Sequence, residues 1–283
     1  MEDYKVMRHA ILVAGMKDSG VLQQVINLYD DKDIDFFVHF DKKFAQPKLV
    51  SNFSHIQVLN PDNIYWGGPS LVALSLRLLK TAYTSRTYDY YHLISSEDFP
   101  MKSKSDFMDF FAENSNTEYV DIDDVSGFFD FRIRSYHFFE KWKMPRSIKY
   151  LLSEKIGRMQ MKLGIERADY INVIGKGSQW FSVSNQFVQE IFSSKHDRFL
   201  NLAVDKTLAA DEVWIQTILL NSDNRFKTRE AMRYVDWERG KPFKFSVEDF
   251  DEIKIKIKNK DNYLFIRKVD LALAKGLVSI LSE

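Results

Sequence analysis

Continuous apolar runs alternate with helical repeats in the first part of the chain. Residues 9–14 form such a run, which is typical of a parallel strand covered on both faces, and residues 35–41 and 56–59 predict the second and third strands. After the first run, apolar residues within 21–28 follow helical spacing. Strand–helix–strand at this spacing predicts an α/β unit of the nucleotide-binding type, which binds ligands at the carboxyl ends of its strands.

A second helix and a further strand follow. Residues 71–82, rich in Leu and Ala, predict a helix that the Gly-Gly-Pro turn at 67–69 introduces. The apolar run at 90–95 predicts a strand, and the polar sequence Ser-Glu-Asp at 96–98 comes directly after it. These polar groups suit the wall of a binding site or a turn that merely precedes Pro100, and both interpretations stay open.

Residues 114–165 depart from this pattern and are rich in Phe, Lys and Arg. They predict a solvated helical lid whose basic side chains lay their stems along apolar surface, and an acceptor-binding insertion is the alternative. The chain shows no internal repeat, low-complexity tract or clear linker. We therefore predict one domain, residues 1–283.

The last third of the chain carries the charged residues of most interest. Residues 177–184 predict a strand that a helix follows. Apolar positions at i and i+4 within 209–219 predict a buried amphipathic helix with Glu212 in its first turn. A carboxylate at that place suits the helix dipole, which this window alone favours, or catalysis. The apolar segment 263–269 contains Arg267 and Lys268, which suit a solvated strand end or an anion site.

Composition narrows the classes of protein. Hydrophobic residues at 45% and aromatic residues at 14% exclude a disordered chain, and 40 Lys and Arg against 40 Asp and Glu give no overall field for nucleic acid. There is no cysteine, which fits a reducing compartment and excludes disulfides, thiolate metal sites and Cys nucleophiles. The sequence has no G-x-G-x-x-G and no Walker loop, so dinucleotide and P-loop interpretations lose support.

The N-terminus and the hydropathy profile bear on location. Residues 1–5 are too charged for a signal peptide, and no apolar run reaches about 18 residues. We therefore expect a cytoplasmic protein that is at most peripheral at the inner face of a membrane.

Eight motifs occur in an order that is specific although each motif alone is weak: HAILVAG, FFVHFDKK, YWGGPSLVALSLRLL, YHLISSEDFPMKS, GSQWFSVSNQFV, ADEVWIQTILLNS, RYVDW and LFIRKVD. Together they span about residues 8–270. They resemble the core-2/I-branching β-1,6-N-acetylglucosaminyltransferase family, which also contains protein xylosyltransferases. The short form without a membrane anchor is similar to bacterial members.

The resemblance implies a GT-A fold, which is a Rossmann-like α/β fold with a mixed central sheet flanked by helices. It also implies inverting transfer of a sugar, N-acetylglucosamine or xylose, from a UDP-sugar donor to a glycan or lipid-linked sugar acceptor. No metal or other cofactor is required in the family. On this basis residues 1–112 form a nucleotide-binding half, 113–270 an acceptor and catalytic half, and 271–283 a C-terminal helix.

Site residues follow from the same resemblance. Glu212 matches the general base of the family, and Arg267 and Lys268 match its diphosphate-binding residues. The remaining assignments are nucleotide binding by Gly15, Asp41 and Asp98, and acceptor binding by Trp237, Glu118 and Arg132. A core position is the alternative for Trp237, and a lid position is the alternative for Arg132. Many relatives have a His where this chain has Gly15-Met16, near the nucleotide, which leaves the identity of the nucleobase of the donor open.

The chemistry of transfer agrees with these assignments. Single displacement needs a base for the acceptor hydroxyl and a cationic group to offset the charge of the leaving diphosphate. Many GT-A enzymes use a metal held by a D-x-D motif, which Asp121 and Asp123 form here, whereas Arg267 and Lys268 would supply fixed positive charge. We therefore favour a metal-independent transferase over a metal-dependent one that uses Asp121 and Asp123. A non-catalytic sugar- or nucleotide-binding protein on the same fold is the third hypothesis, and it would not need a base.

Overall fold

The computed structural model describes residues 7–142, 145–222, 226–240, 242–259 and 262–282. Residues 1–5, which we expect not to form a signal peptide, lie outside the described residues, as does Glu283 at the end of the predicted C-terminal helix. Contacts between Cα atoms group the chain into two compact units. Unit 1 comprises Met1–Asp62, Thr81–Ser115 and Met232–Glu283, and unit 2 comprises Asn63–Lys80 and Asn116–Ala231. The single-domain organisation and its internal boundaries stay a prediction.

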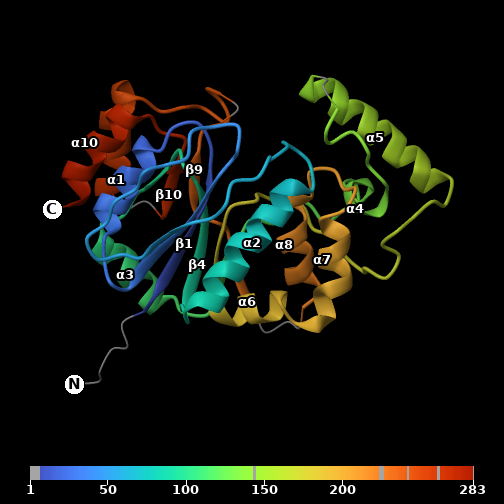
Figure 1. The fold of residues 1–283 in the computed structure, drawn as a ribbon, viewed down its shortest axis with the longest axis horizontal. Helices are drawn as coiled ribbons and strands as arrows, with labels where there is room; N and C mark the ends of the chain where they lie inside the picture. The colour runs from blue at the N-terminus through green and yellow to red at the C-terminus, as the bar shows by residue number, and fades with distance from the viewer. Residues whose placement is uncertain (1–6, 143–144, 223–225, 241, 260–261, 283) are drawn as a thin grey trace. The chain divides into compact units, whose positions relative to one another are not determined.

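Unit 1 contains the strands that the continuous apolar runs predict. The parallel strands β1 (His9–Gly15), β2 (Ile34–Phe40), β3 (Ile56–Val58) and β4 (Tyr90–Ser95) hydrogen-bond in the order β3-β2-β1-β4 (Figure 1). All residues of β2 and β4 are buried, which explains why apolar residues predominate on both faces of these strands. In this register Gly15 lies opposite Phe40, so the carboxyl ends of β1 and β2 meet at one edge.

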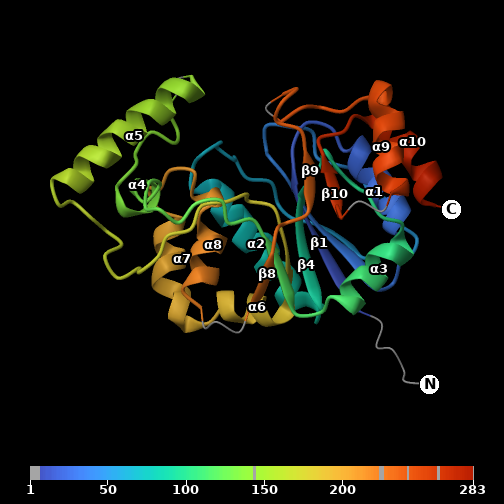
Figure 2. The same cartoon turned by 180° about the vertical axis from the view of Figure 1, so that it is seen from behind.

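A second, three-stranded sheet completes unit 1. Its order is β5-β10-β9, formed by β5 (Asp98–Pro100), β10 (Phe265–Arg267) and β9 (Arg233–Val235). Strand β10 pairs antiparallel to β5 and parallel to β9. The helices of this unit are α1 (Gly20–Tyr29), α3 (Lys104–Glu113), α9 (Phe250–Lys258) and α10 (Leu271–Leu281). Helices α1 and α10 come from opposite ends of the chain and pack side by side (Figures 1 and 2).

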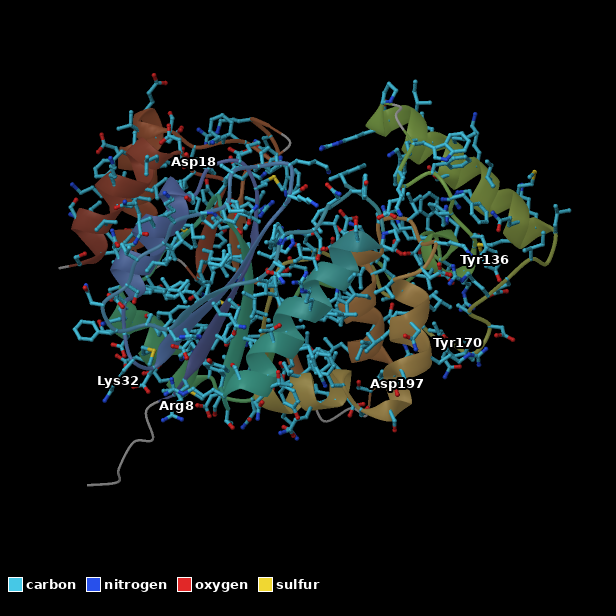
Figure 3. The ribbon with its side chains drawn as sticks, viewed as in Figure 1. Arg8, Asp18, Lys32, Tyr136, Tyr170 and Asp197 are labelled. Atoms are coloured by element: carbon cyan, nitrogen blue, oxygen red, sulfur yellow. The ribbon has the colours of Figure 1, made fainter. Side chains whose placement is uncertain are left out.

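Unit 2 combines three strands with several helices. Strand β6 (Thr117–Val120) pairs antiparallel to β7 (Phe181–Ser184) and parallel to β8 (Lys227–Arg229). The helices are α4 (Phe131–Arg134), α5 (Arg146–Lys162), α6 (Asn185–Ile191), α7 (Asp197–Ala203) and α8 (Trp214–Leu220), and α2 (Ser70–Ser85) begins in this unit and ends in unit 1. Tyr170, on the loop after α5, packs its ring under Arg198 of α7, next to the Asp197 labelled in Figure 3.

The predicted α/β fold with a mixed sheet flanked by helices is confirmed. Parallel pairs dominate unit 1, and unit 2 adds the antiparallel β6–β7 pair. No helix in the described part of the chain combines the length and the apolar character that a membrane crossing needs.

The predicted helix at 209–219 is wrong in its first half. The α-helix begins only at Trp214, and Ala210–Glu212 form a separate 3-10 turn. Two backbone features interrupt the helix: Ala209 has a φ of +43°, in the left-handed region, and Val213 has a φ of −132°. Glu212 therefore precedes the α-helix and does not lie in its first turn. The strand predicted at 177–184 is also shorter, because only Phe181–Ser184 pair as a strand.

Candidate active site

The carboxyl edge of the parallel sheet in unit 1 collects three predicted site regions. Gly15 ends β1, and its carbonyl accepts a hydrogen bond from the backbone N–H of Asp41, which follows β2 (3.1 Å). A side chain at position 15 would collide with the ring of Phe40, so close packing is a sufficient reason for this glycine. The hydroxyl of Ser96, after β4, accepts from the Met16 N–H and donates to the Met16 carbonyl. The strand ends that the sequence marked for nucleotide binding thus lie together.

Asp98 and Arg267 form a buried ion pair. The β5–β10 register sets them opposite each other, and Arg267 Nη1 lies 2.9 Å and 3.1 Å from the two carboxylate oxygens of Asp98. Ser95 donates to the same carboxylate from its N–H and its hydroxyl. Arg267 is therefore not a solvated strand end, because its guanidinium is buried and holds a carboxylate that is fully buried.

Glu97 is the centre of a lysine cluster that sequence reasoning only partly found. Lys268 Nζ lies 3.0 Å from Glu97 Oε2, Lys244 Nζ lies 3.0 Å from Oε1, and Lys17 Nζ lies 3.8 Å from Oε1. Burial raises the pKa of the Glu97 carboxyl, but the hydrogen bonds from Lys244 and Lys268 outweigh burial and bring this pKa down to about 2.

Positive charge exceeds negative charge in this part of unit 1. The three lysines and Arg267 carry four positive charges against the two of Glu97 and Asp98, which leaves an excess of two. Lys17 and Lys244 were missed because nothing in their local sequence links them to Glu97, which lies 80 and 147 residues away. We call Lys17, Lys244, Arg267 and Lys268 the basic cluster.

Trp237 lies just after the end of β9, in the second sheet. Val235 at the end of β9 pairs with Arg267 at the end of β10, and Trp237 is two residues further along the chain. Its side chain is 65% exposed, so the core position that we considered for it is wrong. An exposed indole near a cationic strand end can stack on the apolar face of a sugar ring, and this role stays a prediction.

In unit 2, the turn that carries Glu212 is held by its backbone. The N–H of Ala209 donates to the carbonyl of Gly67 (2.8 Å), and the carbonyl of Glu212 accepts from the N–H of Gly177 (2.8 Å). A Cβ at Gly177 would collide with the carbonyl of Asp121, so only glycine permits this close approach. The turn is thus fixed by the Gly-Gly-Pro segment on one side and by Gly177 on the other.

The Glu212 carboxylate pairs with Arg132. Arg132 Nη1 lies 2.8 Å from Glu212 Oε2, and the side chain of Arg132 is buried while that of Glu212 is 40% exposed. Burial lowers the pKa of the Arg132 guanidinium, but the charge of Glu212 and the hydrogen bond to Tyr150 outweigh burial, so this pKa is raised and Arg132 stays charged. Arg132 is therefore not a solvated lid arginine, since it is buried and contacts the predicted base directly.

Two further groups near Glu212 were not among the site residues that the sequence predicts. The Tyr150 hydroxyl of α5 accepts a hydrogen bond from Arg132 Nη2 (2.9 Å), and the guanidinium also lies over the ring of Phe129, 4.7 Å from its centroid. Asp211 is buried beside Glu212, and burial together with the Glu212 charge raises the pKa of Asp211 to about 7. Tyr150 lies in no pattern that marks it, because its contact with Arg132 arises only in the fold. Asp211 stands beside Glu212 in the motif ADEVWIQTILLNS, but the sequence does not show that it is buried.

Glu118 occupies a different part of unit 2. It lies in β6 and is buried, and its two oxygens accept hydrogen bonds from the N–H (2.8 Å) and the hydroxyl (2.6 Å) of Ser184, the N-cap residue of α6. Burial raises the pKa of Glu118 to about 7, against these two hydrogen bonds, which lower it. Acceptor binding by Glu118 stays a prediction, which its burial does not favour.

The two carboxylates of the D-x-D alternative both have partners within unit 2. Asp121 Oδ1 accepts a hydrogen bond from the backbone N–H of Ala231 (2.7 Å), and Asp123 Oδ2 lies 3.2 Å from Lys176 Nζ. Within the residues that the structure describes, no group of three or more His, Cys, Asp or Glu side chains is arranged to hold a metal ion.

Comparison with known proteins supplies the family. The sequence model described as "Core-2/I-Branching enzyme" matches residues 22–257. "Xylosyltransferase oxt" of Drosophila melanogaster is 22% identical over 278 residues, which are 88% of this chain and 30% of that protein. This chain thus spans less than a third of the length of that relative. The family match covers most of the chain and agrees with the resemblance that the ordered motifs indicate. The chain therefore belongs to the Core-2/I-Branching enzyme family of glycosyltransferases.

Proposed function

We propose that this protein is an inverting, metal-independent glycosyltransferase. It moves a sugar, N-acetylglucosamine or xylose, from a UDP-sugar to a hydroxyl of a glycan or lipid-linked sugar acceptor. Glu212 is the general base, and Arg267 and Lys268 stabilise the leaving diphosphate. Membership in a glycosyltransferase family and the similarity to a protein named as a xylosyltransferase support the reaction class.

The observation that carries the proposal is the state of the Glu212 carboxylate. Arg132 fixes Oε2 at 2.8 Å, and among the described residues none donates a hydrogen bond to Oε1. The side chain is partly exposed, so an acceptor hydroxyl can reach the second oxygen. The contact with Arg132 thus orients the carboxylate and leaves one oxygen for the proton of the acceptor hydroxyl, as a general base requires. A carboxylate that served only the backbone turn would not need a buried arginine.

The leaving group requires positive charge, which the basic cluster supplies. As the bond between the sugar and the diphosphate breaks, negative charge develops on the diphosphate. The excess of two positive charges around Glu97 and Asp98 supports donor binding at this edge, and the neighbouring strand ends at Gly15 and Asp41 suit the nucleotide. Lys17, Lys244 and Lys268 are all more exposed than Arg267, so the three lysines of the basic cluster reach a ligand more readily than the arginine does.

The metal-dependent alternative needs Asp121 and Asp123 as ligands. Asp121 accepts a backbone hydrogen bond and Asp123 pairs with Lys176, so a metal would have to displace both partners. These contacts favour the metal-independent reading. Turnover that disappears in EDTA and returns with Mn²⁺ would promote the two aspartates to ligands.

The decisive experiment is a panel of UDP-sugars assayed for hydrolysis and for transfer with the parent protein and with Glu212→Gln. Glutamine keeps the shape of the side chain but cannot accept the proton, so kcat for transfer should fall about 10²–10⁴-fold. UDP affinity should stay within a few-fold of the parent, because other residues hold the diphosphate. Turnover of Glu212→Gln close to that of the parent would show that Glu212 is not the base. UDP binding without transfer or hydrolysis in the parent itself would favour the non-catalytic binding protein.

A further inference from the structure

Helix α5 of unit 2 has an apolar face that points to solvent. Ile148, Leu151 and Met159, and Leu163 just after the helix, have side chains that are between 52% and 67% exposed. Their spacing of three, eight and four residues places them along one side of the helix. Phe138 and Trp142, on the segment before α5, are exposed to a similar degree. Nine of the large apolar side chains that are exposed in the described part of the chain lie within residues 125–165.

The opposite face of α5 is firmly attached to its unit. Gln160 accepts a hydrogen bond from the N–H of Tyr136 (3.0 Å) and donates one to its carbonyl (2.9 Å), and the Gly157 carbonyl accepts from the hydroxyl of Ser135 (2.8 Å). Tyr150 on the same face holds Arg132. Figures 1 and 2 show α5 extending away from α7 and α8 of its own unit, and Figure 3 labels Tyr136 beside it. The apolar residues are therefore exposed because the helix is held by its other side.

The exposed face is also strongly basic. Among the described residues of 141–162, four basic side chains are exposed (Lys141, Arg146, Lys155 and Lys162), whereas the single Glu, Glu154, is half-buried and pairs with Arg158. Lys155 lies between Leu151 and Met159 in the exposed stripe, and Lys162 is exposed beside Leu163. On such a surface the apolar side chains can enter a lipid layer, while the ammonium groups of the lysines between them remain at the charged boundary of that layer.

We propose that this outer face of α5 docks on an anionic lipid bilayer. Ile148, Leu151, Met159 and Leu163 enter the boundary between headgroups and acyl chains, and Lys155 and Lys162 bind lipid phosphates. The charge excess selects this occupant, because a neutral apolar partner surface would leave the interleaved lysines unpaired. The docking surface is independent of the proposed function, since it rests on residues that take no part in the chemistry.

Vesicle sedimentation with the full chain tests this inference. We expect binding to phosphatidylcholine vesicles that contain phosphatidylglycerol and little binding to phosphatidylcholine alone. The triple variant Ile148→Ser, Leu151→Ser, Met159→Ser should bind at least tenfold more weakly. Lys155→Gln with Lys162→Gln should weaken binding about 25-fold at low salt, from about fivefold for each lysine, and added salt should weaken the parent in the same sense.

Matched variants in unit 1 control for lost apolar surface and lost charge. Val50→Ser, Phe53→Ser and Ile255→Ser remove exposed apolar groups elsewhere, and Lys32→Gln with Lys48→Gln remove exposed charge. Both controls should bind vesicles as the parent does. Equal binding of the parent to both vesicle types, or equal loss in the α5 and control variants, overturns the proposal. So does self-association or protein binding that the triple variant abolishes while the parent ignores vesicles, since the face would then fit a protein.

Discussion

Replacing Arg132 with methionine tests the contact on which the candidate base depends. Methionine keeps an extended apolar stem inside unit 2 but removes the guanidinium. The variant loses the 2.8 Å hydrogen bond to Glu212, the 2.9 Å hydrogen bond to Tyr150 and the cation–π contact with Phe129. Glu212 then loses this partner, and its carboxylate can rotate.

The size of the effect follows from the unequal exposure of the pair. Removing one partner of a fully buried ion pair costs about 3–5 kcal/mol, because the other charge stays unpaired in the interior. Glu212 is 40% exposed, so water can take over much of the lost interaction. We therefore expect a smaller loss of unfolding free energy, about 1–3 kcal/mol. Loss of a fixed orientation of the base should lower kcat about 10–100-fold.

The assay measures kcat, both KM values and the melting temperature of Arg132→Met. Arg134→Met is the matched control, because Arg134 lies in the same short helix, is also largely buried and pairs with Asp130 and Glu166 instead of Glu212. It should melt early with near-normal kcat. If both variants lower kcat equally, or if Arg132→Met keeps kcat within threefold of the parent, then Arg132 supports only the fold and the reasoning fails.

Three other predictions concern the basic cluster, the indole and the buried carboxyl. Lys268→Met should raise the donor KM about tenfold or more with little change in melting temperature, since Glu97 keeps Lys244 as a partner; a normal donor KM contradicts a donor role. Trp237→Ala should raise the acceptor KM and leave slow donor hydrolysis and stability unchanged, because the side chain is exposed; an unchanged acceptor KM would remove it from the site. The pKa of Glu118 rises on folding from 4.5 to about 7, so the native state retains a proton that the unfolded state loses. Its contribution to the unfolding free energy should therefore fall by about 3 kcal/mol between pH 4.5 and 7 and stay level above that range. Urea unfolding of the parent and of Glu118→Gln across this range tests this fall, which only the parent should show. Equal pH dependence of the two proteins would mean that Glu118 ionises normally.

Strands with continuous apolar runs were the most predictable part of the fold. The run at residues 90–95 coincides with β4, and the run at 9–14 falls short of β1 by one residue. Burial on both faces explains this success, because it favours apolar side chains at most positions whatever the distant partners are. The Glu212 helix failed for the opposite reason. Its apolar spacing is helical, but Ala209 takes a left-handed conformation that a hydrogen bond to Gly67 stabilises. The local sequence does not indicate this conformation.

The partners of the site residues could not be read from the sequence. Arg132 lies 80 residues before Glu212, and Lys244 lies 147 residues after Glu97. Local spacing carries no information about such contacts, which arise only when the elements pack. The motif resemblance placed Glu212 and Lys268 without their surroundings, so it could name candidate groups but could not say which of them are buried, paired or exposed.

Arg267 and Lys268 show why that difference matters for experiment. As neighbours in sequence they look like two equivalent cations, but Arg267 is buried against Asp98 whereas Lys268 binds Glu97, which has two other lysines near it. Alanine at position 267 would leave the Asp98 carboxylate buried with only the N–H and hydroxyl of Ser95 as described hydrogen-bond donors to it, a change that costs several kcal/mol of stability before any donor is bound. A loss of activity in that variant would therefore mix folding with chemistry. Position 268 separates the two, because its removal leaves no buried charge unpaired, and a change in donor binding there can be attributed to the diphosphate.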